Sequence, residues 1–393
     1  MSLKKIPILS FFTGAGLLDI GFLEQGFKIV WHNEKFLPFV QAFEAGLSSL
    51  GFKGASATIQ NKQSIVEVGP NTILNEAFNS AKPPKLFGII GGPPCPDFSV
   101  GGKNRGKLGE QGKLSEVFFN RIVELNPTFF LFENVPGLLR TAKHRDFLVT
   151  LLDKVSSRFS LDLRILNALD LGVPQDRERI FIVGFKNSWL RSNLKPKSFK
   201  RIKNASEFVR LLSKLPPKKF FTDIDHWFPW PEEPAYKGAK YRFDWPTDNV
   251  PKGKVPTKPD CPPELMVGNY ICDKKRLLLK NSSEGFRPKS NKFKVILEGD
   301  VSRKSFKRLH RYRYSPAAAY GNNEVHLHPE LPRRLTVREA MMIQSIPDEY
   351  ILPENMTLTD KFKTIGNGVP VKLASAIAGS FAYFLKEGRH EII

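Results

Sequence analysis

Cysteine is scarce in this 393-residue chain, which contains only Cys95, Cys261 and Cys272. An odd number of cysteines without a Cys-x-x-Cys pair excludes a disulfide framework and a cysteine-rich zinc site, and it indicates reduced thiols. Long apolar runs are missing as well, since no uncharged stretch approaches the roughly 20 residues of a membrane-spanning helix. The sequence therefore predicts a soluble, cytoplasmic protein, with no metal and no membrane partner.

Acidic residues are outnumbered, because 60 Lys and Arg face 39 Asp and Glu and give a net charge of +21. The excess is concentrated in one segment. Residues 186–315 hold 31 basic and 13 acidic side chains, or +18, which leaves 29 minus 26, or +3, for the rest. Clustered positive charge favours a polyanionic partner, most often nucleic acid, over a merely soluble basic surface.

The chain divides into three parts that differ in their pattern of apolar, charged and turn residues. Up to about Phe185, buried strand-like runs alternate with helix-like segments, a pattern that predicts a parallel sheet with helices on both faces. The expected strands are IPILSFF, FKIVW, LFGII, TFFLF, LDLRIL and RIFIVGF. Residues 186–315 are irregular, basic and rich in Pro and aromatic residues. Residues 316–393 form the C-terminal part. Helical patterns return there from roughly Arg333, and the last of them should pack back on the domain 1–185.

A glycine turn follows the first predicted strand in FFTGAGLLDIGF. Phe12, Gly14 and Gly16 open a helix there, which permits a cofactor to lie against the backbone. Glu34 ends the next strand, twenty residues past Gly14, where a carboxylate can bind both ribose hydroxyls. This spacing favours a nucleoside-containing cofactor over a bare structural turn.

Two further strands end in chemically active side chains. Cys95 lies in the stiff turn GGPPCPDFS after LFGII, and Glu133 lies in ENV after TFFLF. The carboxyl ends of parallel strands share one edge of a sheet, so the thiol and the carboxyl group can meet in one cleft. The pair fits a nucleophile and an acid.

Other segments allow more than one interpretation. In QDRER, Gln175, Arg177 and Arg179 precede the last strand, and both arginines should point to one side. Residues 101–114, rich in Gly and Lys, fit either a mobile loop that closes over a substrate or a solvated loop. FKRLHRYRYS fits either DNA contact or a hinge strand between domains. We expect His326 and His328 to be solvated loop residues, and Cys261 and Cys272 to be structural.

The motifs in order resemble those of a known family. FxGxG, GGPPCPDFS, ENV, QDRER, RRLTVREAMMIQSIPD and IGNGVPVKLA look like the successive signatures of the DNA (cytosine-5) methyltransferases, from Phe12 to about Ala378. The basic segment lies where that family keeps its target recognition domain. The resemblance implies an α/β fold with a Rossmann-like methyltransferase sheet and a second, smaller basic domain. It also implies methyl transfer from S-adenosylmethionine to C5 of cytosine in double-stranded DNA, with no metal.

The resemblance also implies roles for individual residues. Cys95 would attack C6 of a flipped cytosine, Glu133 would hold and protonate N3, and Arg179 would bind O2 with support from Arg177 and Gln175. The cofactor pocket would be lined by Phe12, Gly14, Gly16, Glu34, Pro94, Asn367 and Val369. DNA contacts would come from Ser99, Lys103, Arg105, Arg311 and Arg313.

This chain departs from the family pattern at Pro96, where Gln or Asn is usual, and at Ser64, where the aspartate that contacts adenine is usual. The expected protein is a monomeric prokaryotic or phage enzyme, solitary or paired with a restriction endonuclease that acts on the same sequence. Two alternatives stay open. One is an RNA cytosine-5 methyltransferase of the same superfamily, and the other is an inactive DNA-binding homologue.

Overall fold

The computed structural model describes most of the chain. The described residues are 6–52, 59–79, 82–94, 110–195, 202, 205–214, 225–287, 291–303, 305–317, 320 and 326–386. The structural statements below concern these residues.

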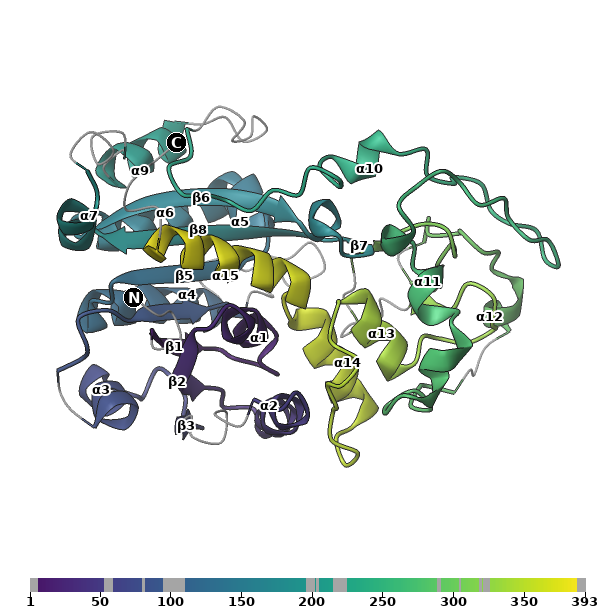
Figure 1. The fold of residues 1–393 in the computed structure, drawn as a ribbon, viewed down its shortest axis with the longest axis horizontal. Coiled ribbons are helices and arrows are strands. Elements are labelled where there is room, and N and C mark those ends of the chain that lie inside the picture. The colour runs from purple at the N-terminus through teal and green to yellow at the C-terminus, as the bar shows by residue number, and fades with distance from the viewer. Residues whose placement is uncertain are drawn as a thin grey trace.

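A seven-stranded sheet forms the centre of the molecule, with strand order β3-β2-β1-β4-β5-β8-β6 (Figure 1). Its strands are β1 (Pro7–Phe11), β2 (Lys28–Asn33), β3 (Ile59–Asn61), β4 (Gly88–Gly91), β5 (Phe129–Asn134), β6 (Phe159–Asn167) and β8 (Glu178–Lys186). The six strands predicted from sequence are all present, and the predicted α/β class is confirmed. The short strand β3 was not predicted.

The expectation of a wholly parallel sheet is wrong at one edge. β1, β2, β3, β4 and β5 pair in parallel, whereas β8 inserts between β5 and β6 and pairs antiparallel with both. Only the short helix η4 (Ala168–Leu171) and β7 (Gln175–Asp176) separate β6 from β8. A parallel crossover needs a dozen or more residues, usually with a full α-helix, so this short connection returns the chain antiparallel.

Helices cover both faces of the sheet (Figure 1). Alternate residues of β5 point to opposite faces and pack against different helices. Phe129 and Leu131 pack in one core cluster with α1 (Leu17–Glu24) and α15 (Val371–Lys386). Phe130 and Phe132 pack in the other, with α3 (Pro70–Phe78), α4 (Glu110–Leu125) and α6 (Ala142–Ser156). A strand buried on both faces has few polar positions, which explains the continuous apolar run TFFLF.

The C-terminal helix packs back on the first half of the chain, as predicted. Phe381 of α15 contacts Phe22 of α1 and Phe129 of β5, with ring centroids 5.7 and 5.1 Å apart. By length and composition the helical stretch Leu358–Lys386 could cross a membrane, but 67% of its apolar window is buried inside the protein. Its apolar face is therefore used as a core face.

The basic part of the chain is built from short elements around small apolar clusters (Figure 1). The remaining helices of the described chain are α2 (Leu37–Ser49), α5 (Gly137–Arg140), α7 (Asn187–Asn193), α9 (Ala205–Lys214), α10 (Ala239–Arg242), η5 (Pro263–Leu265), α11 (Gly268–Ile271), η6 (Lys274–Leu278), α12 (Lys292–Val295), α13 (Val337–Ile343) and α14 (Leu358–Asn367). The remaining strands are β9 (Lys307–Arg308), β10 (Ser315–Pro316) and β11 (His326–Leu327). The boundaries 185/186 and 315/316 stay predictions.

The segment FKRLHRYRYS joins these small elements to the first half of the chain. It contains β9, which pairs with β11, and its end begins β10, which pairs in parallel with β7. Ser315 lies opposite Gln175 in this pairing. The register supports the interpretation of this segment as a connecting strand.

His326 and His328 are not solvated loop residues, so that prediction is wrong. Each is 2% exposed, and His326 belongs to β11. The Nδ1 atom of His328 accepts hydrogen bonds from the backbone N–H groups of Glu330 and Leu331, both at 3.1 Å. The pairing of β11 with β9 carries this stretch into the interior.

Candidate active site

The turn after β1 shapes one side of the site. Gly14 and Gly16 have φ values of +59° and +77°, a left-handed conformation that favours glycine, and Phe12 between strand and turn has a φ of 56°. Glu34 follows β2, and its carboxylate accepts hydrogen bonds from the backbone N–H groups of Gly14 at 3.1 Å and Phe36 at 2.8 Å. The two predicted cofactor elements thus meet directly.

This turn fits a nucleoside-containing cofactor. A methyl group built on Gly14 would meet nothing within 4 Å, so the backbone there borders open space that a ligand can occupy. A carboxylate has about four lone-pair sites, so Glu34 keeps capacity for a ribose hydroxyl beside its backbone hydrogen bonds. Burial raises the pKa of Glu34, while the hydrogen bonds from the Phe36 and Gly14 backbone lower it.

The IGNGVP motif reaches the same turn from the other end of the chain. A methyl group on Gly368 would lie 2.4 Å from Cδ1 of Leu17, the first residue of α1. Asn367 ends α14 and is exposed, whereas Val369 is 4% exposed and packs in the core cluster with α1 and α15. Asn367 is therefore the member of this motif that is free to meet a ligand.

Glu133 occupies the carboxyl end of β5, at the centre of the sheet. A methyl group on Gly92, just after β4, would lie 2.5 Å from Glu133 Oε2, so glycine is required for this close approach. The side-chain amide of Asn134 donates to the carbonyl oxygen of Pro93 at 3.4 Å. These contacts hold the turn that leads through Pro94 toward Cys95 against the end of β5.

Arg179 pairs with Glu133 from the neighbouring antiparallel strand. Arg179 Nε lies 3.1 Å from Glu133 Oε1, and the two side chains are 14% and 11% exposed. Burial raises the pKa of Glu133, whereas Arg179 and then Arg177 lower it. A carboxyl group in this environment holds its proton more readily than an exposed glutamate does.

Arg177 and Gln175 connect this edge to the C-terminal motifs. The Arg177 side chain is 1% exposed and donates from Nη2 to the carbonyl oxygens of Gly366 at 2.6 Å and Gly368 at 3.0 Å. Gln175 is fully buried and donates to the carbonyl oxygen of Ile343 at 3.3 Å. In the structure these two residues position elements of the site.

Four predicted residues lie outside the described part of the chain, namely Cys95, Ser99, Lys103 and Arg105. The predicted closing loop, residues 101–114, lies there up to residue 109. The described chain reaches Pro94, the residue before Cys95, and the preceding Pro93 contacts Asn134, the residue after Glu133.

Arg311 and Arg313 are engaged within the basic part of the chain. Arg311 forms an ion pair with Glu298 at 2.7 Å and another with Glu330. Arg313 donates to the carbonyl oxygen of Pro246 at 3.0 Å. The predicted DNA contact of either arginine therefore requires that these bonds be exchanged.

Sequence reasoning missed Asp19 and Gly92. Asp19 is 1% exposed in the first turn of α1, and burial raises its pKa from 3.8 to about 7, against a lowering by Ser10. An acidic residue with apolar neighbours on both sides, in LLDIGF, was the available signal. Gly92 could have been found from the Gly-Gly pair that precedes two prolines.

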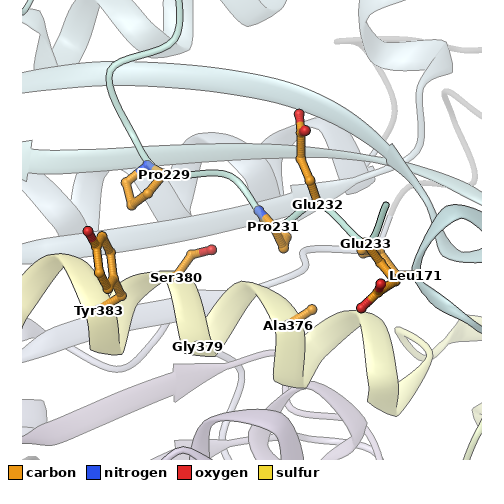
Figure 2. Close-up of a pocket in the computed structure, with 9 residues that line it drawn as sticks. All are labelled: Leu171, Pro229, Pro231, Glu232, Glu233, Ala376, Gly379, Ser380 and Tyr383. Carbon is orange, nitrogen blue, oxygen red and sulfur yellow. The ribbon is translucent and has the colours of Figure 1, made fainter. Parts of the chain in front are cut away.

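A pocket of about 330 Å³ lies away from this edge, between α15 and the chain at residues 229–233 (Figure 2). It is lined by Leu171, Pro229, Pro231, Glu232, Glu233, Ala376, Gly379, Ser380 and Tyr383. Glu232 is held in ion pairs with Arg164 at 2.7 Å and Lys237 at 3.1 Å. The pocket contains no residue predicted from the sequence to act in the site.

Comparison with protein families gives a match to the model described as C-5 cytosine-specific DNA methylase, over residues 6–382. Two curated relatives resemble the chain over nearly its whole length. The type II methyltransferase M.NmeDI of Neisseria meningitidis serogroup C is 41% identical over 98% of this chain and 85% of its own. M.MthTI of Methanothermobacter thermautotrophicus, also a type II methyltransferase, is 30% identical over 95% of this chain and 96% of its own.

Solved structures share the fold. A prophage-encoded protein of E. coli, described as a DNA modification methyltransferase, has a TM-score of 0.59, with 22% identity over 97% of this chain and 100% of its own. The S. pombe Dnmt2 methyltransferase has a TM-score of 0.57, with 13% identity over 97% of this chain and 99% of its own.

Proposed function

Because the chain belongs to the C-5 cytosine-specific DNA methylase family, we propose that it flips one cytosine out of a short duplex sequence and methylates C5 through a Cys95 adduct. S-adenosylmethionine, the cofactor of this family, supplies the methyl group when bound. The residues that fit it best are Phe12, Gly14, Gly16, Glu34, Pro94 and Asn367, with Val369 supporting the turn from the core. The remaining steps belong to the chain's own side chains.

The chemistry begins with the thiolate of Cys95. Its sulfur forms a bond to C6, and the C5–C6 double-bond electrons make C5 a nucleophile that takes the methyl group. Glu133 donates a proton to N3 as charge builds in the ring, and Arg179 donates to the O2 atom. Loss of the C5 proton to a base then restores the double bond and expels the Cys95 thiolate, and N3 returns its proton to Glu133.

The target base must leave the helix, because its C6 atom is inside the base stack. Unstacking costs a few kcal/mol, which contacts with the extruded nucleotide offset. In this proposal Ser99, Lys103 and Arg105 contact phosphates as the loop closes. Arg311 and Arg313 act from the basic segment, where recognition of the sequence is expected.

The observation that carries this proposal is the Glu133–Arg179 pair at the carboxyl edge of the sheet, 3.1 Å apart and held beside the turn that leads to Cys95. A buried carboxyl group with a raised pKa can protonate N3, and the neighbouring guanidinium offers donors for O2. The cofactor turn around Gly14 opens at the same carboxyl edge, since β1 and β5 are parallel members of one sheet.

The relatives' names describe type II methyltransferases, which supports a restriction-modification context. We propose a partner endonuclease that cuts the same unmodified sequence, with the methyltransferase working as a monomer. Co-expression is the simplest check: a nuclease encoded with this chain should be lethal to a host in which Cys95→Ser replaces the intact enzyme.

Bisulfite sequencing tests the function itself. Plasmid DNA from a methylation-free host that expresses the chain should keep unconverted cytosines in one short motif. The Cys95→Ser variant, expressed at the same level, should leave every cytosine convertible. If the intact, folded chain protects no cytosine, the DNA assignment is overturned, and a competition assay with folded RNA decides the alternative substrate.

A further inference from the structure

An exposed tyrosine stands on a short helix beside the catalytic edge. Tyr241 of α10 is 86% exposed, and Lys240 and Arg242 flank it in sequence. The Lys240 ammonium group lies 5.6 Å from the centroid of the Tyr241 ring. The ring and the basic groups beside it are thus open to a ligand that approaches this face.

The helix that carries Tyr241 is rigidly mounted. The indole N–H of Trp245 donates to the carbonyl oxygen of Ala239 at 2.8 Å, and the backbone N–H of Ala239 donates to Asp170 at 3.2 Å. Ala239 and Trp245 are buried together with Leu169 in one apolar cluster. The backbone of α10 is thus fixed before any ligand arrives.

An ion pair places α10 against the QDRER segment. Lys240 Nζ lies 2.8 Å from Asp176 Oδ2, and Asp176 stands between the two buried residues Gln175 and Arg177. Its other oxygen accepts a hydrogen bond from the side-chain amide of Asn167 at 2.8 Å. α10 belongs to the basic part of the chain, and Figure 1 shows it above β7.

The charged side chains around Tyr241 are of both signs, with the exposed Glu232, Glu233 and Asp244 lying near the basic ones. The side chains of Lys237 and Lys240 are 69% and 37% exposed, and Arg242 is exposed as well. Asp176 of β7 forms an ion pair with Lys240, and Glu178 of β8 forms one with Arg140. An aromatic ring among lysines and arginines is the combination that packs on nucleotides and meets phosphates.

We propose that residues 237–242, here called the Tyr241 ridge, bind the DNA backbone beside the target cytosine. In this arrangement the Tyr241 ring packs on a sugar or base next to the flipped nucleotide. Lys237 and Lys240 exchange their ion pairs with Glu232 and Asp176 for contacts with phosphates. Such contacts hold the duplex against the catalytic edge without reading its sequence. The inference rests on the proposed function and adds a contact surface to it.

Binding measurements with single variants test the ridge. The duplex carries the motif found by bisulfite sequencing, and fluorescence anisotropy gives Kd at several salt concentrations. Tyr241→Ala should raise Kd about tenfold, as expected for loss of one aromatic–nucleotide contact, whereas Tyr241→Phe should stay within about twofold. The plot of log K against log salt has a negative slope. The Lys237→Ala and Lys240→Ala variants should each make that slope less steep by about 0.9.

Two matched control variants lie elsewhere. Tyr383, 43% exposed, belongs to the pocket on α15, and Lys154 pairs with Glu116 at 2.8 Å, much as Lys240 pairs with Asp176. Tyr383→Ala and Lys154→Ala should leave both Kd and the salt slope unchanged. The methylated motif should be the same in all variants.

The outcomes separate the two proposals. If the wild type methylates and binds its motif but all ridge variants bind as the wild type does, the ridge is not a DNA surface and the inference is overturned. If Tyr241→Phe loses as much affinity as Tyr241→Ala, ring packing is overturned. If the wild type itself neither binds nor methylates DNA, the proposed function fails, and the inference fails with it.

Discussion

Glu133 is a carboxyl group whose surroundings act on its pKa in opposite directions. Burial at the end of β5 raises the pKa of Glu133, and the guanidinium groups of Arg179 and Arg177 lower it, with a net rise. The acid is therefore more often protonated than an exposed glutamate, and it still has a charged partner that stabilises it after proton transfer. This balance depends on Gly92, which lets the carboxyl group lie against the preceding turn.

Replacing Glu133 by Gln should remove the proton donor and keep the shape of the side chain. We expect kcat to fall by about 10²–10⁴-fold, the usual contribution of a positioned acid. In the wild type, kcat should fall as pH rises through the raised pKa of Glu133, since the protonated form is active. Single-turnover methyl transfer across pH measures both; an unchanged rate in Glu133→Gln would contradict the assignment.

Asp19 offers a second test, on stability. Its pKa is raised by burial from 3.8 to about 7, so the folded protein binds a proton that the unfolded chain loses above pH 3.8. The free energy of unfolding therefore falls as pH rises from about 4 to 7, and above pH 7 this group causes no further change.

The Asp19→Asn variant should therefore be more stable than the wild type by about 1–4 kcal/mol at pH 8, and equal to it near pH 4. Urea unfolding at the two pH values measures the difference. The same stability gap at both pH values would show that Asp19 does not titrate in this range.

Among the elements, α1 and α15 pack most closely where each has a small residue. A methyl group on Gly21 of α1 would lie 2.4 Å from the backbone carbon of Ala374 in α15. Gly379, one turn further along α15, would place its methyl group 3.7 Å from Gln25, at ordinary contact distance. The two glycines thus form a matched pair in one interface.

The Gly21→Ala variant should lose about 1–3 kcal/mol of stability, because the helices must move apart. Gly379→Ala should be neutral or slightly stabilising, since alanine favours the helix and finds room. Thermal unfolding of both variants measures this. Equal effects of the two substitutions would contradict the close packing of α1 on α15.

At the scale of the whole molecule, one buried ion pair joins the segment after η6 to α14. Lys361 is 1% exposed and pairs with Glu284, which also accepts a hydrogen bond from Asn281 at 2.7 Å. The backbone N–H of Val337, the first residue of α13, donates to the carbonyl oxygen of Glu284 at 2.8 Å. Three segments distant in sequence therefore depend on this contact.

Glu284→Ala should destabilise the protein by about 3–5 kcal/mol, because it leaves the Lys361 ammonium group buried without a counter-charge. The double variant Glu284→Ala/Lys361→Met should recover a large part of this loss. Denaturant unfolding of the single and double variants measures the recovery. A double variant no more stable than Glu284→Ala would show that the uncompensated charge is not the cause.

The sequence alone determined the six main strands, the α/β class and the order of the motifs, because these depend on local apolar runs and turn residues. It also placed Glu34 and Glu133 at strand ends, since a residue after a buried strand reaches the carboxyl edge wherever the sheet is parallel. The family followed from the same motifs, and the match over residues 6–382 confirms it.

Only the tertiary structure decided what those side chains touch. The antiparallel β8 brings Arg179 to Glu133, and it directs Arg177 into the core to hold Gly366 and Gly368, although both arginines belong to one motif. Local pattern also missed the burial of His326 and His328, and the pairing of Lys240 with Asp176 that holds α10 beside β7. These contacts join residues far apart in the chain, and their partners are set by packing, which local periodicity does not encode.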